Sequence, residues 1–516
     1  MPGDALTVAE VLRRRARSRA EHPLLVCDTD RISYAGADRR SAALARGLIA
    51  LGAGKGTHVG LLYPNGTEFV VGMLAAARIG AVVIPFSTFA TARELREQLV
   101  DSDTEILLAA RSFRHHDYAQ RLAEALPGAN LSSGAPLFCT AAPQLRRVVL
   151  DPGRVPGPAA AARVDDPTLL AAMESDVDGC DPLAIVYTSG STAAPKGVVH
   201  THTGLLEHQR NLNDIRGLTS EDRLFCNSPF FWIGGFAFGL LATMVAGSTL
   251  VCSNATDPGR TLDLLEAEKP TITNGFAAGI AHLSDHPSFP GRDLSSMRRG
   301  NLYPIMAPDA RPADPQLRHN MLGLTEAGSV VLISGDESDQ PEGRRGSFGK
   351  PAPGFETLIL GPDASGVGEL CIRGPYVMQG YHKRSREESF DADGWFHTGD
   401  LVRTDADGFF YYVGRLGAMI KTAGANVSAA EVERAIARVT GAQAHVVGIP
   451  DARRGELVAA VVVQPDLDEA GLRARLEAEL SSYKIPKRFL ALSRTEIPLL
   501  SSGKVDLRQL RKLFDA

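Results

Sequence analysis

The chain has 516 residues, which is enough for about two to four folding units with substantial cores. Hydrophobic residues make up 44% of it and charged residues 22%, so the composition excludes a wholly disordered or collagen-like chain. The formal net charge of −5 provides no basic surplus, and nucleic acid is therefore not an expected partner.

Neither disulfides nor a membrane span are expected. The six cysteines lie far apart and form no CxxC pair, which favours reduced thiols and a cytoplasmic location. The first residues contain no apolar signal core. No charged residue occurs between Arg223 and Asp257, but glycines and polar residues interrupt this stretch. We therefore expect it to form a strand, a loop and a buried helix rather than a membrane span.

The N-terminal part alternates helical patterns with short apolar runs. Alternation of this kind predicts crossover units and a mostly parallel sheet. Residues 127–166 are rich in Pro, Gly, Ala and Ser and are predicted to be a surface connection. Before them, the pattern predicts helices at 8–19, 66–80 and 92–103 and strands at 58–64, 81–86 and 105–110.

The last hundred residues have a different organisation. They are predicted to begin as a loop at Gly414 and to form a compact α+β domain. The expected elements are helices at 428–439 and 470–482 and strands at 444–450, 457–464 and 488–493. The fold class is thus α/β, with a large N-terminal region of several parallel-sheet subdomains and a small C-terminal domain. We place the large domain at 1–413, a hinge at 414–417 and the small domain at 418–516.

The segment YTSGSTAAPKG, from Tyr187 to Gly197, is the most informative one. An apolar strand ends there, and a loop of small and hydroxylated residues follows. Backbone N–H groups in such a loop can converge on phosphate oxygens, and Lys196 can add a positive charge. A flexible linker is the alternative, but the preceding strand and the Lys-Gly pair weigh against it. The segment is not a Walker loop, because GxxxxGK[ST] is absent.

Further motifs follow in an order that resembles the adenylate-forming superfamily, which includes acyl-CoA synthetases, luciferases and peptide-synthetase adenylation domains. YTSGSTAAPKG resembles the phosphate loop of that family. The other motifs are GLTEAG (323–328), GELCIRGPYVMQGY (368–381), GWFHTGDL (394–401), GRLGAMIKTAGANVSAAEVE (414–433) and PLLSSGK (498–504). The resemblance covers almost the whole chain. It implies that the small domain is mobile and rotates between the two half-reactions.

The resemblance also implies how ATP is bound. Glu326 would bind Mg²⁺, and Thr325 would bond a phosphate or acyl oxygen. Asp400 and Arg415 would hold the ribose, and Lys504 would bridge the acyl carboxylate and the α-phosphate. The β- and γ-phosphates would be held by the loop residues Thr188, Ser189, Gly190, Ser191, Thr192 and Lys196.

Sites for CoA and the acid follow from the same resemblance. Gly424 would let the backbone approach the pantetheine arm, and Lys421 could meet CoA phosphates. Trp232 stands where many relatives have a gating histidine, although a core aromatic is an equally good interpretation. The acyl pocket is expected to hold a bulky or aliphatic monocarboxylic acid. Its predicted lining is Trp232, Gly235, Phe236, Gly275, Phe276 and Met321.

The chain departs from the family pattern at several positions. Gly417 replaces the usual Asp or Lys of the hinge, Ala193 a phosphate-loop glycine, and Leu322 an aromatic that stacks on adenine. A GGAPL-type segment is not evident between residues 294 and 322. Two further departures are Ala429 and Leu500. These changes raise the hypothesis that adenylation is weak or lost.

The leading prediction is an acyl-CoA ligase that uses ATP, Mg²⁺ and CoA and passes through an acyl-adenylate and AMP. One alternative is a ligase that only thioesterifies an acyl-adenylate supplied by a partner adenylating ligase, as in platensimycin-type biosynthesis. Another is a stand-alone enzyme that loads a carrier protein, and a third is a catalytically inactive nucleotide-binding module. A homodimer is common in the family.

Overall fold

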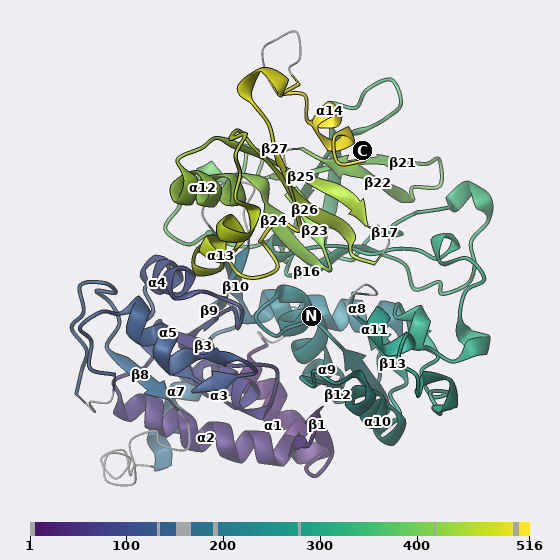
Figure 1. The fold of residues 1–516 in the computed structure, drawn as a ribbon. Helices are drawn as coiled ribbons and strands as arrows, with labels where there is room; N and C mark the ends of the chain where they lie inside the picture. Colours follow the sequence, from purple (N-terminus) through teal and green to yellow (C-terminus); the bar gives the residue numbers. More distant parts are fainter. Residues whose placement is uncertain are drawn as a thin grey trace. The chain divides into compact units, whose positions relative to one another are not determined.

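The computed structural model describes residues 6–131, 135–150, 167–188, 195–276, 280–416, 419–451, 453–498 and 505–515 (Figure 1). The chain divides into two compact units. Unit 1 consists of residues 1–88, 99–187 and 197–414, and unit 2 of residues 89–98, 188–196 and 415–516. The predicted boundaries at 413, 414–417 and 418 stay a prediction, and residues 417 and 418 lie outside the described residues.

A mostly parallel sheet is the first layer of unit 1. Its strand order is β20-β10-β9-β4-β3-β5-β8. Parallel pairing joins β3 to β4 and β5, β5 to β8, and β4 to β9, whereas β20 is antiparallel to β10. The strands are β3 (His58–Leu62), β4 (Val82–Pro85), β5 (Ile106–Ala109), β8 (Arg147–Leu150), β9 (Pro182–Thr188), β10 (Lys196–Thr201) and β20 (Gly380–Tyr381).

A second sheet has the order β14-β13-β11-β12-β1-β2. It is parallel except at its edge, where β2 pairs antiparallel with β1. Its strands are β1 (Pro23–Cys27), β2 (Asp30–Ser33), β11 (Arg223–Cys226), β12 (Thr249–Cys252), β13 (Ile272–Asn274) and β14 (Arg299–Gly300). Ligands bind open α/β sheets of this type at the carboxyl ends of the strands, and the segments predicted to line the acyl pocket lie at that edge.

Helices α1, α2 and α3 pack against one another in unit 1. α1 begins at a capping box in which Thr7 and Glu10 satisfy each other's backbone N–H groups. α3 is buried along nearly its whole length, as its run of Val, Met, Leu and Ala predicts. The helices of unit 1 are α1 (Val8–Ser18), α2 (Tyr34–Ala50), α3 (Thr67–Arg78), α5 (Tyr118–Ala125), α7 (Pro167–Asp176), α8 (His202–Arg216), α9 (Ala242–Ala246), α10 (Pro258–Glu268) and α11 (Ala281–Ser284); α4 (Ala92–Asp101) spans residues of both units.

Smaller antiparallel sheets complete unit 1. One has the order β15-β16-β17, another the order β18-β19-β21-β22, and β6 pairs with β7. The nine-residue β21 alternates buried and more exposed residues, which is typical of a strand that packs one face on a core. The strands are β6 (Ser112–Phe113), β7 (His116–Asp117), β15 (Leu322–Leu324), β16 (Ser329–Ile333), β17 (Lys350–Pro351), β18 (Glu356–Leu360), β19 (Gly368–Arg373), β21 (Phe396–Thr404) and β22 (Phe410–Arg415).

The C-terminal part of unit 2 is an α+β structure around one sheet. Strands β24-β23-β26-β25 follow in order, and β27 pairs with β26. Apolar residues of α12 and α13 pack on this sheet around Val432 and Leu472. The elements are β23 (Met419–Thr422), β24 (Ala425–Ser428), α12 (Ala429–Thr440), β25 (Ala444–Asp451), β26 (Gly455–Val462), α13 (Glu469–Glu479), β27 (Arg488–Ala491) and α14 (Leu507–Lys512).

The structure confirms the predicted fold class and corrects two local predictions. Residues 127–166 contain β8, an edge strand of the first sheet, so they are not merely a surface connection. The region after Gly414 is not a loop, because β23 and β24 form a hairpin there. The uncharged stretch after Arg223 forms β11, a π-helix (Gly234–Leu241), α9 and β12. Within the described residues, no helix is long and apolar enough to cross a membrane.

Candidate active site

A short turn in unit 1 presents Thr325 and Glu326. The antiparallel strands β15 and β16 are joined by a single 3-10 turn, Thr325–Ala327. Both side chains are half-buried. The turn thus places Thr325 and Glu326 at consecutive positions directly after β15, and the phosphate and magnesium roles predicted for them stay predictions.

Backbone hydrogen bonds hold this turn in place. His200 Nε2 donates to the Thr325 carbonyl at 2.7 Å, and the Met378 N–H donates to the Glu326 carbonyl at 2.8 Å. The amide of Gln209 donates to the Gly328 carbonyl at 3.3 Å. Burial lowers the pKa of His200 to about 4, so its ring is neutral at pH 7 and supplies one N–H. These donors fix the backbone without using either functional side chain.

A tyrosine orients the Glu326 carboxylate. The Tyr381 hydroxyl donates to Glu326 Oε1 at 2.7 Å. Hydrogen bonds to a charged acceptor are the stronger kind, so this contact limits the rotation of the carboxylate. Mg²⁺ binds proteins through one or two carboxylates. An oriented carboxylate therefore fits the metal role predicted for Glu326.

Strand β21 carries Asp400, the predicted ribose ligand. Asp400 is 2% exposed, and its N–H donates to Thr398 Oγ1 at 3.0 Å. Thr398 in turn donates to the Leu370 carbonyl of β19 at 2.7 Å. The neighbouring Gly399 N–H donates to Glu369 Oε1 at 3.0 Å. Side chains of β19 and β21 thus define the path of the backbone at Asp400.

The predicted acyl segments meet at the carboxyl edge of the second sheet. Strands β11, β13 and β14 are parallel neighbours, and Asn227, Gly275 and Asn301 follow their ends. Asn301 exchanges two hydrogen bonds with the Gly275 backbone, at 3.1 and 2.9 Å. Asn227 does the same with the Phe276 backbone, at 3.2 and 3.3 Å. Two amide side chains therefore clamp the segment that was predicted to line the pocket.

Aromatic rings gather beside this clamp. Trp232 lies edge-to-face with Phe276 at 6.0 Å between ring centroids, and with Phe231 at 5.4 Å. Phe276 is 36% exposed. The structure thus brings two of the predicted acyl-pocket residues, Trp232 and Phe276, into contact. A wall of this kind suits an apolar or aromatic ligand.

Other predicted pocket residues lie in the surrounding core. Phe236 is fully buried and packs edge-to-face on Phe69 of α3. Gly235 lies in the π-helix, against the Pro229 carbonyl. Met321 is half-buried against the core around β16. Their predicted contact with substrate stays a prediction.

Part of the predicted ATP and CoA machinery falls outside the described residues. These residues are Ser189, Gly190, Ser191, Thr192 and Lys504, together with the departures Ala193, Gly417 and Leu500. Thr188 ends β9, Lys196 begins β10 and Arg415 ends β22. In unit 2, Lys421 is exposed on β23, and its N–H donates to Glu456 Oε2 at 2.8 Å. Gly424 follows Ala423 in the two-residue turn between β23 and β24.

The described departures have local explanations. Leu322 is 3% exposed and belongs to the apolar core around β16. Ala429 is the first residue of α12 and is 1% exposed. Between residues 294 and 322, Arg299–Gly300 forms β14 beside β13, so this unusual segment still supplies a strand to the sheet. How these changes affect ATP binding stays a prediction.

The residues that support the site were not predicted from the sequence; they are His200, Gln209, Tyr381, Asn227 and Asn301. Each acts through a contact between segments that are distant in the chain, so no local spacing in the sequence predicts it. One signal was present for Asn227, which directly follows the short apolar run 224–226. Carboxyl ends of parallel strands meet at one edge, which marks such positions as candidates.

Comparison with known proteins identifies the family. Residues 12–382 match the family described as AMP-binding enzyme, and residues 431–504 match the AMP-binding enzyme C-terminal domain. The chain belongs to this adenylate-forming family. It is an enzyme of the acid-thiol ligase class, in the acyl-CoA ligase branch.

Two curated relatives illustrate the range of this branch. A feruloyl-CoA synthase of Amycolatopsis sp is 32% identical over 519 residues, covering 97% of this chain and 98% of the relative. A Mycobacterium tuberculosis CoA ligase, named for a methyl-dioxo-octahydroindenyl propanoyl group, is 32% identical over 540 residues, covering 99% and 100%.

A solved structure shares the fold. The o-succinylbenzoate CoA synthetase of Bacillus subtilis aligns with a TM-score of 0.76 at 24% identity, covering 97% of both chains.

Proposed function

We propose that this chain forms an acyl-CoA thioester from a carboxylic acid, ATP and CoA through an acyl-adenylate. The observation that carries the proposal is the Thr325–Glu326 turn, whose carboxylate is oriented by Tyr381 at 2.7 Å. A fixed carboxylate next to a hydroxyl is the arrangement needed to bind a phosphate together with its divalent cation. The relatives named as CoA ligases support the same reaction class.

Each predicted site residue has a role in adenylation or in thioester formation. Thr325 donates a hydrogen bond to an oxygen of the α-phosphate or acyl group. Asp400 and Arg415 position the ribose, and Lys504 offsets the charge that develops as the carboxylate attacks the α-phosphorus. Mg²⁺ held by Glu326 would neutralise phosphate charge. The phosphate loop with Lys196 holds the departing pyrophosphate, and the Lys421–Gly424 hairpin receives CoA.

Pyrophosphate release with a panel of acids tests this proposal. The panel holds ferulate, straight-chain aliphatic acids and a fused-ring propanoate, each with ATP, Mg²⁺ and CoA. We expect acid-dependent pyrophosphate and a matching thioester for at least one acid. Glu326→Gln is expected to lower the rate by about 10- to 100-fold, because a charged ligand is lost. Glu387→Gln, which changes an exposed glutamate outside the site, is the matched control. Equal rates for the two variants would contradict the role of Glu326.

A second candidate function is thioesterification alone. The burial of Leu322, at 3% exposure, supports it, because an aromatic would otherwise be expected to stack on adenine there. A synthetic acyl-adenylate plus CoA would then give thioester, whereas acid plus ATP would give no pyrophosphate exchange. A partner adenylating ligase would supply the intermediate. Robust pyrophosphate exchange with any acid of the panel would rule this candidate out.

The acid itself is proposed to be a bulky or aliphatic monocarboxylate. The ring contacts of Trp232 with Phe231 and Phe276 support an apolar chamber. Trp232→Ala removes part of this wall and so enlarges the chamber. The ranking of acids by kcat/KM should therefore shift towards longer or wider acids. An unchanged ranking would show that Trp232 does not line the chamber.

A further inference from the structure

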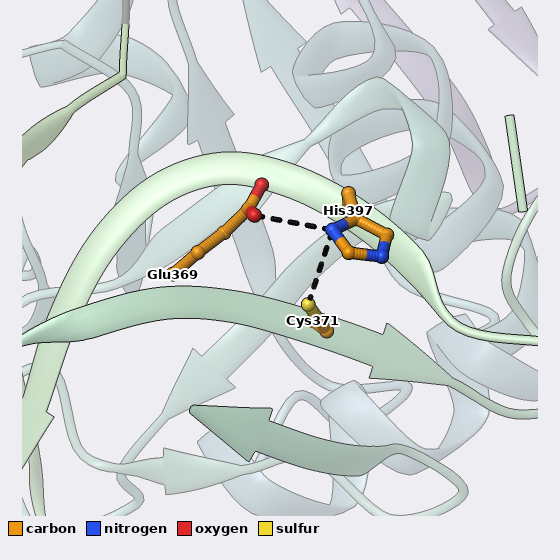
Figure 2. Close-up of side chains that lie close together, drawn as sticks. All are labelled: Glu369, Cys371 and His397. Carbon is orange, nitrogen blue, oxygen red and sulfur yellow. Dashed lines mark hydrogen bonds and ion pairs between the residues drawn. The ribbon is translucent and has the colours of Figure 1, made fainter. Parts of the chain in front are cut away.

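Three potential metal ligands converge on neighbouring strands of unit 1. Glu369 and Cys371 lie on β19, two residues apart, and His397 lies on β21. Cys371 and His397 face each other across the antiparallel pair, and the register shifts between Glu369 and Cys371. Figure 2 shows the three side chains pointing towards one another. None of them is a predicted ligand of ATP, CoA or the acid.

The ligand atoms are spaced as in a tetrahedral site. Cys371 Sγ lies 3.7 Å from His397 Nδ1, and His397 Nδ1 lies 3.1 Å from Glu369 Oε2. All three atoms lie within 4.8 Å of one another. With zinc bonds of about 2.3 Å to sulfur and about 2.0 Å to nitrogen and oxygen, neighbouring ligand atoms are about 3.3–3.6 Å apart. The two distances from His397 Nδ1 therefore lie within a few tenths of an ångström of the spacing around a zinc ion.

An outer set of contacts orients these ligands. His397 Nε2 lies 3.4 Å from Asp391 Oδ2, on the side of the ring away from the cluster. Asp391 is itself fixed by the N–H groups of Asp393 and Trp395. Glu369 Oε1 accepts the Gly399 N–H at 3.0 Å, so Oε2 is the oxygen that faces the cluster. A carboxylate behind a histidine and a bonded ligand carboxylate are the usual supports of a protein metal site.

Burial and charge also suit a divalent ion. Cys371 is 1% exposed, whereas the His397 side chain is 37% exposed, so solvent can reach the cluster at the histidine. Burial raises the pKa of the Cys371 thiol to about 11, so the metal itself must displace the proton; the resulting thiolate and the Glu369 carboxylate together carry two negative charges, which match an ion of charge +2. Sulfur and imidazole ligands select zinc over Mg²⁺. This cluster therefore differs in chemistry from the magnesium role of Glu326.

We propose that Glu369, Cys371 and His397 bind Zn²⁺ through Oε2, Sγ and Nδ1, with water in the fourth position. The thiol proton passes to solvent as the sulfur–metal bond forms. The bound ion ties β19 to β21 three residues before Asp400. The ion stabilises the strand that carries Asp400, the predicted ribose ligand, and takes no part in the reaction.

Cobalt absorption and zinc titration test the site on the full chain. After chelator treatment and dialysis, Co²⁺ should bind one ion per chain with a thiolate-to-cobalt charge-transfer band. Cys371→Ser should remove the band, whereas Cys180→Ser, which changes an exposed cysteine elsewhere, should keep it. Competition with a chromophoric chelator should show that Asp391→Asn binds zinc at least 10-fold more weakly than the wild type. The reason is that a carboxylate behind a metal-binding histidine contributes about 10- to 100-fold to metal affinity.

His397→Ala provides a second variant, because its partly exposed side chain can be removed with less risk to folding. It should lose stoichiometric zinc while keeping the wild-type circular dichroism. Absence of the band in the wild type, or its persistence in Cys371→Ser, would overturn the proposal. The cluster would then be an ion pair between His397 and its two carboxylates. Because the readouts are absorption and metal content, they do not depend on the ligase activity.

Discussion

Tyr381 is the residue through which the position of Glu326 can be tested without changing the carboxylate. Tyr381→Phe removes a hydroxyl that donates to Glu326 Oε1 at 2.7 Å and leaves the ring in place. A hydrogen bond to a charged group contributes about 1.5–3 kcal/mol, so kcat/KM for pyrophosphate release should fall about 10- to 100-fold. The half-saturating Mg²⁺ concentration should rise as well.

Tyr411→Phe is the matched control for this variant. It also removes a tyrosine hydroxyl that donates to a carboxylate, that of Asp405, at 2.8 Å. Asp405 belongs to no predicted site. The control should keep its magnesium dependence, and a comparable shift in both variants would attribute the effect to stability instead.

Gly275 tests the clamp beside the aromatic wall. It has a φ of 152°, and an added Cβ would lie 1.7 Å from Asn227 Oδ1. Gly275→Ala must therefore displace the Asn227 amide that holds Phe276. We expect an overpacking cost of about 1–3 kcal/mol and a higher KM for the acid. Urea unfolding and steady-state kinetics measure the two effects.

Gly291→Ala is the comparison for the clamp, since a Cβ there meets nothing within 4 Å. Its stability and its KM should both stay close to wild type. If Gly275→Ala destabilised the chain but left the KM for the acid unchanged, the clamp would be structural and would not belong to the acyl pocket.

A buried histidine at the start of helix α8 is expected to make the stability of the chain depend on pH. His202 is the first residue of α8, directly after the N-cap Thr201, and its Nδ1 accepts the Val8 N–H at 3.2 Å. Burial lowers the pKa of His202 to about 4, from an ordinary value of 6.5. Protons therefore bind the unfolded chain more readily, so stability should decrease as the pH falls from about 6.5 towards 4.

His202→Asn isolates this contribution. An asparagine oxygen can still accept the Val8 N–H but does not titrate. Between about pH 8 and about pH 5 the wild type should lose about 2 kcal/mol at this site, and the variant should not. Urea unfolding at both pH values measures the difference, and His115→Asn, which changes an exposed histidine, is the control. Equal pH slopes for wild type and His202→Asn would contradict the assignment.

At the scale of elements, the sequence predicted those helices and strands whose apolar residues recur at a regular spacing. Helix α3 and strand β3 appear within two residues of their predicted bounds, because their apolar patterns are continuous. Strand β8 was missed, since only four residues of a long Gly- and Pro-rich segment pair with β5. The β23–β24 hairpin was missed because its turn, Ala423–Gly424, lacks an Asn-Gly or Asp-Gly signature.

For the site, motif order identified the residues that were predicted to touch ligands. Motif order could not identify the residues that hold those site residues in place. His200 and Thr325 are 125 residues apart, and Asn227 and Phe276 are 49 apart. Such bonds depend on which strands become neighbours, and no local pattern specifies this. The burial of Leu322 in a core has the same origin.

For the whole molecule, the family match spans both units, so a change confined to unit 2 can test the proposed thioesterification separately from the proposed adenylation. Gly424 has a φ of 85° in the turn that was predicted to meet pantetheine. Gly441, the C-cap of α12, has a φ of 74° and so carries the same backbone requirement outside that turn. Alanine at either position costs about 1 kcal/mol of strain. Only Gly424→Ala is expected to disturb the hairpin that we propose receives CoA.

The two glycine variants should therefore differ in one half-reaction only. With the best acid of the panel, pyrophosphate release without CoA should be the same in Gly424→Ala and Gly441→Ala. Thioester formation from synthetic acyl-adenylate and CoA should fall at least 10-fold in Gly424→Ala alone, a loss of about 1.4 kcal/mol of transition-state stabilisation. If both variants lost thioester formation equally, the hairpin would have no special role, because the shared strain in unit 2 would account for the loss.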